Sequence, residues 1–123
     1  MENDLLPLKN YAHIGDAVWE VFVRDYVILK TSNSKTMHKM TTDRVNAAFQ
    51  MSMLEYISDE LSEIEKELVR RARNLPIPVG RKSIQHEYRL ATAFETLIGF
   101  WYLHDKARLN FFFEKFNTCE YFA

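Results

Sequence analysis

Apolar residues recur every three or four positions along almost the whole sequence, which is the spacing of one face of an α-helix. The first stretch runs from about Lys9 to Leu29, and its predicted buried stripe consists of Tyr11, Ile14, Val18, Phe22 and Leu29. Further helices are predicted from about Lys35 to Tyr56, after Ser62, from about Ser83 to Leu103, and from about Asp105 to Asn117. The pattern predicts an all-α bundle of about six to seven helices.

Local signals place some of the helix ends. Ser62 and Glu65 have the spacing of a capping box, in which each side chain binds a backbone N–H of the first turn. Leu75–Gly80 contains two prolines, each of which forces the residue before it out of the helical region, so this segment is predicted to be a loop. Only three glycines and three prolines occur in the chain, which disfavours a turn-rich β-sandwich or barrel.

The composition limits the class of protein. A length of 123 residues suits a single domain, 1–123. Cys119 is the only cysteine, no apolar run is long enough to span a bilayer, and Met1–Asp4 is acidic where a secretory signal would be basic, so we expect a cytoplasmic protein without a membrane partner. No cysteine and histidine spacing indicates zinc, and no glycine-rich loop indicates a nucleotide cofactor.

Two acidic residues lie beside glycines inside predicted helices. Gly15 precedes Asp16, and Gly99 follows Glu95 by one turn. Glycine in a helix costs about 1 kcal/mol relative to alanine, so a packing or functional reason is expected. Because both acids are embedded in apolar sequence, they should be paired with a base, protonated, or bound to a metal. A Mg²⁺ site and a structural salt bridge, for example from Asp16 to Arg24, remain alternatives here.

Basic residues flank the predicted proline loop although the net charge is only -1. The candidate phosphate-binding residues are Arg70, Arg71, Arg73, Asn74, Arg81 and Lys82. Clustered arginines can bind phosphates, which favours a nucleic-acid surface. The alternative is a solvated helix end whose positive charge complements the helix dipole.

Two segments resemble the signatures of the ribonuclease III superfamily. Tyr11–Arg24 (YAHIGDAVWEVFVR) is similar to its first signature helix, and Thr92–Leu103 (TAFETLIGFWYL) to its second. The segments Met37–Lys39, Val69–Asn74 and Tyr88–Arg89 resemble motifs of the Mini-ribonuclease III branch, which has a nuclease domain and no double-stranded-RNA-binding domain. The likeness extends from about Leu8 to Leu109. One signature alone would be weak evidence, but two signatures in the expected order, with these intervening motifs, are specific to this family.

This resemblance implies an all-α homodimer that cuts double-stranded RNA. Asp16 and Glu95 would be both the catalytic residues and the ligands of Mg²⁺, with Mn²⁺ able to substitute. Glu20, one turn after Asp16, would either hold a metal-bound water or orient Asp16, or it would form an intrahelical ion pair with Arg24. The implied products carry 5′-phosphates, and the implied substrate is precursor large-subunit (23S) ribosomal RNA, which would make the protein a factor in ribosomal RNA processing.

Other features leave alternatives open. Full-length relatives have two more carboxylates, at the positions of Ala12 and Thr92, so this chain resembles the Mini branch in lacking them. The leading alternative function is a non-catalytic RNA-binding or ribosome-associated protein on the same fold, which would be expected to lose the two acids. The aromatic residues fill either a dimer interface or a bulky core, and they include Trp19, Phe22, Trp101, Phe111, Phe112 and Phe113.

Overall fold

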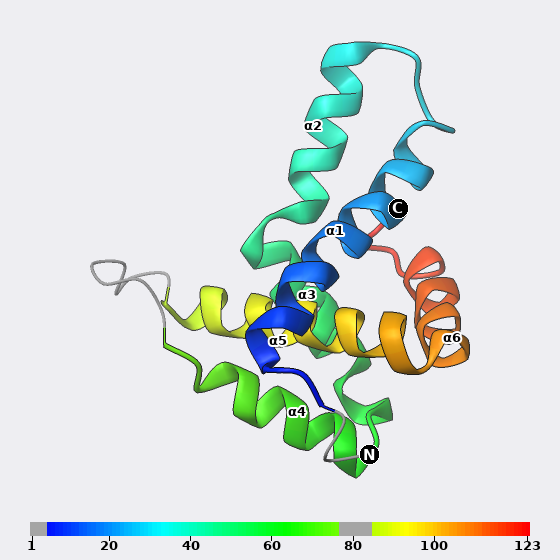
Figure 1. Ribbon diagram of the computed structural model, residues 1–123. Coiled ribbons are helices and arrows are strands. Elements are labelled where there is room, and N and C mark those ends of the chain that lie inside the picture. Colours follow the sequence, from blue (N-terminus) through cyan, green and yellow to red (C-terminus); the bar gives the residue numbers. More distant parts are fainter. Residues whose placement is uncertain (1–4, 77–84) are drawn as a thin grey trace.

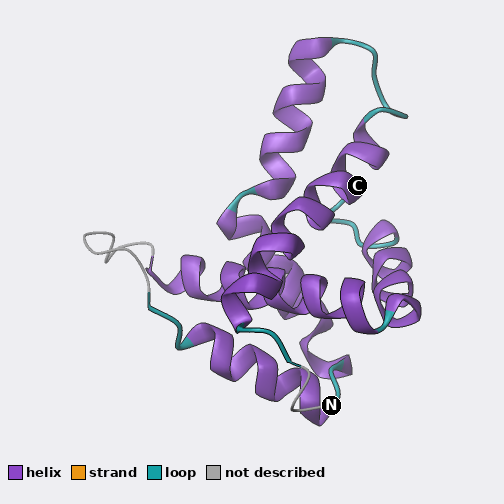
Figure 2. Cartoon of the chain, in the orientation of Figure 1, coloured by secondary structure: helices purple, strands orange, loops and turns teal. Residues whose placement is uncertain are grey.

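The computed structural model describes residues 5–76 and 85–123, and every regular element in these ranges is helical (Figures 1 and 2). The elements are α1 (Leu8–Val27), α2 (Ser34–Val45), α3 (Ala47–Ile57), the short 3-10 helix η2 (Ser58–Glu60), α4 (Glu63–Arg73), α5 (Gln85–His104) and α6 (Lys106–Asn117). The prediction of an all-α bundle is confirmed. No helix in the described ranges is both long and apolar enough to cross a membrane.

Helix α5 is the centre of the arrangement. Figure 1 shows α1 crossing it, and α1, α3 and α4 all pack against it. Helix α2 extends away from the bundle beside the C-terminal half of α1. Buried residues occur on all sides of α5 between Ala91 and Trp101, as expected for a helix surrounded by others.

The helical region predicted from Lys35 to Tyr56 consists of two helices. Asn46 adopts an extended conformation (φ -76°, ψ 163°), which ends α2, and its side chain accepts a hydrogen bond from the Phe49 amide at 2.8 Å. The same residue is therefore the N-cap of α3, a position that asparagine favours. Continuous apolar spacing concealed this break.

The buried face of α1 differs by about one position from the predicted stripe. It contains Tyr11, Gly15, Trp19, Val23 and Val27. Ile14, Val18 and Phe22 are half-buried at its edge. The prediction for Leu29 was wrong, because the helix ends at Val27 and Leu29 lies beyond it, 83% exposed.

Most of the aromatic side chains form the core of this chain. The Trp19 ring meets Phe94 and Phe116 edge-on, with ring centroids 4.9 and 5.4 Å apart, and its indole N–H donates to the Arg44 carbonyl. Trp101 stacks on Phe112 at 4.6 Å. Such pairs stabilise a core beyond the area they bury. Of the aromatic residues considered for a dimer interface, only Phe111 is exposed, at 49%.

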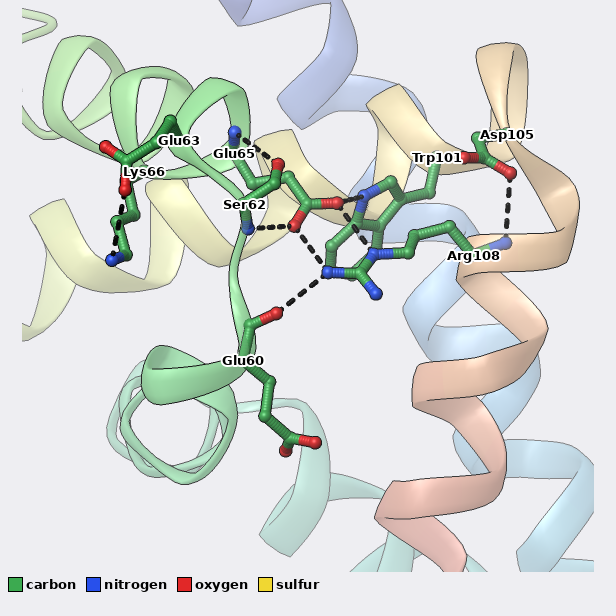
Figure 3. Close-up of polar contacts among 8 residues, drawn as sticks. All are labelled: Glu60, Ser62, Glu63, Glu65, Lys66, Trp101, Asp105 and Arg108. Atoms are coloured by element: carbon green, nitrogen blue, oxygen red, sulfur yellow. Dashed lines mark hydrogen bonds and ion pairs between the residues drawn. The ribbon is translucent and has the colours of Figure 1, made fainter.

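A buried carboxylate joins α4, α5 and α6 (Figure 3). Glu65 accepts hydrogen bonds from the Trp101 indole N–H at 2.8 Å, from the Arg108 guanidinium at 2.8 and 2.9 Å, and from the Ser62 amide at 2.7 Å. The Ser62 hydroxyl accepts from the Glu65 amide, which completes the predicted capping box. Burial alone would raise the pKa of Glu65, but the bonds from Arg108, Ser62 and Trp101 outweigh it and lower the pKa to about 2.

The crossing of α1 and α5 depends on two glycines. A Cβ atom on Gly15 would overlap the Glu95 carbonyl oxygen, and it would lie 2.9 Å from the Gly99 nitrogen. A Cβ atom on Gly99 would overlap the Tyr11 carbonyl oxygen and lie 2.9 Å from Cγ2 of Ile14. The two backbones are therefore in direct contact, and a methyl group at either glycine has no space.

We expect Gly99→Ala to lower the free energy of unfolding by about 3 kcal/mol or more, because the added methyl must separate two packed backbones. Helix propensity alone predicts the opposite sign, a gain of about 1 kcal/mol. Urea denaturation followed by circular dichroism measures the change. Ala17→Ser, which adds one atom on the exposed side of α1, is the control and should cost less than about 1 kcal/mol. A stabilised Gly99→Ala variant would contradict the close contact.

Candidate active site

The glycine contact brings Asp16 of α1 and Glu95 of α5 to one cleft. Asp16 directly follows Gly15, and Glu95 lies one turn before Gly99, so both acids are next to the crossing point. The cleft has a volume of about 450 Å³. It is lined by Lys9, Ala12, His13, Asp16, Ala72, Leu75, Pro76, Tyr88, Arg89, Thr92 and Glu95.

The two carboxyl groups share an unusual electrostatic environment. Asp16 is exposed to solvent, whereas Glu95 is half-buried. Burial, followed by a hydrogen bond with Asp16 and by the negative charge of Asp16, raises the pKa of Glu95 to about 8. The side-chain amide of Gln50 on α3 donates to Glu95 Oε2 at 3.4 Å and partly offsets this rise. Without a cation, Glu95 therefore holds a proton at neutral pH.

This donor set fits a divalent cation of the Mg²⁺ type. Within residues 5–76 and 85–123, neither Asp16 nor Glu95 forms an ion pair with a basic side chain, so the structural salt bridge is not observed. The same ranges contain no cluster of three or more histidine, cysteine or acidic residues that could hold a metal. Mg²⁺ is commonly held by one or two carboxylates, with water and phosphate oxygens as its other ligands. An open cleft with two adjacent carboxylates provides this arrangement.

Neighbouring positions bear on two other predictions. Ala12 and Thr92 both line the cleft, so the positions of the two absent carboxylates lie beside the acids that remain. Glu20 forms an ion pair with Arg24, at 3.1 Å, which supports its alternative role as an intrahelical partner. Both side chains of this pair are largely exposed.

The predicted basic cluster is divided among different surfaces. Arg73 and Asn74 line a recess of about 460 Å³, together with His86, Arg89 and Leu90. Arg70 instead forms two hydrogen bonds with Glu67, at 2.5 and 3.0 Å. Arg71 lines a separate, mainly apolar groove with Leu6, Ile64 and Phe100. Arg81 and Lys82 lie outside the described residues.

Two residues near the acids were missing from the predicted site. Arg89 lines both the cleft and the recess, and its guanidinium donates to the Arg73 carbonyl at 2.8 Å, at the C-terminal end of α4. Gln50 is a polar residue on a helix face that also carries Met53 and Leu54, both buried. A single amide within an apolar stripe could have indicated that Gln50 has a buried polar partner. The sequence does not show that this partner is Glu95, because the two residues are far apart along the chain.

Comparisons with known proteins identify the family to which this fold belongs. Residues 9–106 match the family described as the ribonuclease III domain. The Mini-ribonuclease 3 of Gloeobacter violaceus is 39% identical over 105 residues, covering 85% of this chain and 78% of the relative. A Mini-ribonuclease 3-like protein of Ilyobacter polytropus is 42% identical over 100 residues, covering 80% and 76%. A protein of Fusobacterium nucleatum solved by X-ray crystallography superposes with a TM-score of 0.80, at 29% identity and 93% coverage of both chains.

These matches place the chain in a class of enzymes. Both segments that resemble the signatures, Tyr11–Arg24 and Thr92–Leu103, lie within the residues that match the ribonuclease III domain. The chain belongs to the ribonuclease III family of endoribonucleases, in the branch of the Mini-ribonuclease 3 proteins. The resemblance stated from its two signature helices is thereby confirmed.

The raised pKa of Glu95 predicts how the metal-free protein responds to pH. The folded state binds this proton more tightly than the unfolded chain does, so the stabilising effect of the proton is complete below about pH 4.5 and is lost as pH rises through about 8. We expect Glu95→Gln to melt near the wild-type temperature at about pH 5 and roughly 5 °C above it at about pH 8.5. Differential scanning calorimetry in EDTA tests this, and a difference independent of pH would contradict it.

Proposed function

We propose that this protein hydrolyses phosphodiester bonds in double-stranded RNA with Mg²⁺ held by Asp16 and Glu95. The observation that carries the proposal is the convergence of these two acids at an open cleft, where neither forms an ion pair with a basic side chain of the described residues. A non-catalytic RNA-binding protein on the same fold would have no need for a half-buried carboxyl group beside a second carboxyl group, an arrangement that destabilises the charged form of the pair.

In this proposal each acid has a separate task. When bound, Mg²⁺ lowers the pKa of a water molecule and neutralises charge on the phosphate. Asp16 would hold the cation at the exposed side of the cleft, where the substrate can reach it, and Glu95 would hold the cation as an ionised carboxylate after releasing its proton to solvent. The products would carry 5′-phosphate and 3′-hydroxyl ends, as the family resemblance implies, and Mn²⁺ would substitute for Mg²⁺.

The basic recess gives a route for the RNA backbone. Arg89 lies between the cleft and the recess that contains Arg73 and Asn74, so positive charge continues from the acids towards the end of α4. Duplex RNA is recognised mainly through its shape, its phosphates and its 2′-hydroxyl groups, which such a surface can contact. We assign Arg73, Asn74 and Arg89 to this contact.

The biological context also follows from the family. We propose that the protein acts in the cytoplasm as a homodimer, so that two active sites cut the two strands of one duplex. The proposed substrate is precursor large-subunit (23S) ribosomal RNA, whose ends the enzyme would mature. This substrate rests on the Mini-ribonuclease 3 relatives.

The direct test of the function is cleavage of a long RNA duplex in Mg²⁺, compared with EDTA and with single-stranded RNA. We expect only the duplex in Mg²⁺ to be cut. Asp16→Asn and Glu95→Gln should each reduce the rate by about 10³-fold, the equivalent of several kcal/mol supplied by a metal ion, while duplex binding in EDTA persists. Asp25→Asn, an exposed acid on the same helix, should cut normally. Retained cleavage by Asp16→Asn would rule out the assigned site.

Arg73 and Arg70 lie on different surfaces of α4, so alanine substitutions at these two positions can be compared directly. Arg73→Ala should weaken duplex binding and reduce the slope of log affinity against log salt by about 1, because one phosphate contact is lost. Arg70→Ala, in the same helical turn, should change the slope less because Glu67 already binds Arg70. Filter binding over a range of potassium chloride concentrations measures both slopes. Equal effects would contradict the proposed route of the RNA.

A further inference from the structure

We propose that Gln50 is a positioning residue for Glu95, whose carboxyl group it orients towards Asp16 and the divalent cation. This inference rests on the proposed function, since it concerns the same metal site. It assigns a task in that site to a helix, α3, that contains neither of the two signature segments.

The burial of Gln50 is not explained by core packing. Its side chain is only 2% exposed, and it belongs to the same buried face of α3 as Met53, Leu54 and Ile57. Burying an amide without a hydrogen bond costs about 1–3 kcal/mol, which a methionine or leucine at this position would not incur. The one side-chain hydrogen bond of the Gln50 amide, among the described residues, is to Glu95 Oε2 at 3.4 Å. The hydrogen bond to Glu95 therefore accounts for a buried amide at this position.

The position of Gln50 is fixed by the start of α3. Its backbone N–H donates to the Asn46 carbonyl at 3.1 Å, and the Asn46 side chain caps the same turn. Helix α3 also packs directly on α5, which carries Glu95. Gln50 thus projects from a well-defined first turn, as a residue that orients another side chain requires.

The chemistry of an amide suits this task better than a cation would. Arg108 donates to both carboxylate oxygens of Glu65, so Glu65 is fully engaged in structural contacts. The Gln50 amide carries no net charge and donates to one oxygen of Glu95. It therefore restricts the carboxyl group without supplying a positive charge that competes with the metal. Residues that form hydrogen bonds with metal ligands typically contribute roughly 10- to 100-fold to metal affinity.

The test compares Gln50→Met, which keeps the size and removes the amide, with Met53→Leu, a volume-conserving change on the same buried face. Mn²⁺ binding to the RNA-free protein is measured by electron paramagnetic resonance, and thermal unfolding in EDTA is measured alongside. We expect Gln50→Met to raise the Mn²⁺ dissociation constant about tenfold without a lower melting temperature. The Mg²⁺ concentration for half-maximal duplex cleavage should rise by a similar factor, with an unchanged KM for RNA at saturating Mg²⁺.

Two results would overturn this inference. One is wild-type Mn²⁺ affinity in Gln50→Met, and the other is an equal loss of affinity in Met53→Leu, which would indicate a general effect of core packing. The proposed function fails separately: if the wild-type protein binds Mn²⁺ in a Gln50-dependent manner but does not cut duplex RNA, the positioning role stands and the nuclease proposal does not.

Discussion

The direct contact between the backbones of α1 and α5 is the constraint on which the rest of the structure depends. A side chain at Gly15 or Gly99 would collide with a carbonyl oxygen of the opposite helix, so the two helices can cross at this distance only without Cβ atoms. The oxygen nearest to Gly15 belongs to Glu95 itself. The contact that holds the bundle together is therefore also the contact that brings Glu95 next to Asp16.

Glu65 and Glu95 differ in their hydrogen-bonding partners, and the pKa values of the two carboxyl groups shift in opposite directions. Glu65 is surrounded by donors from Ser62, Trp101 and Arg108, and its pKa falls to about 2, so it remains charged and joins three helices. Glu95 has Gln50 and a second carboxyl group as neighbours, and its pKa rises to about 8. Among the described residues neither carboxyl group of this pair has an ion-pair partner, so the charged pair is less stable alone than Glu65 with its donors. The bundle around Glu65 provides the rigid frame in which this arrangement persists.

Much of this architecture could be predicted because its signals are local. Helical spacing, the capping box at Ser62 and the two glycine-flanked acids all lie within short segments, and the family resemblance connected the acids. Features that depend on distant partners could not be predicted in this way. The break at Asn46 was hidden by continuous apolar spacing, and the amide of Gln50 meets a carboxylate 45 positions away. The separation of Arg70 from Arg73 depends on which side chain pairs with Glu67.

The central claim is that the glycine contact creates one divalent cation site between Asp16 and Glu95. Its most direct test is a crystal structure of the protein with Mn²⁺, with diffraction data collected at a wavelength where manganese scatters anomalously. The account predicts an anomalous peak coordinated by both carboxylates at the crossing of α1 and α5. A well-ordered structure with Mn²⁺ bound elsewhere and none between these two side chains would contradict it.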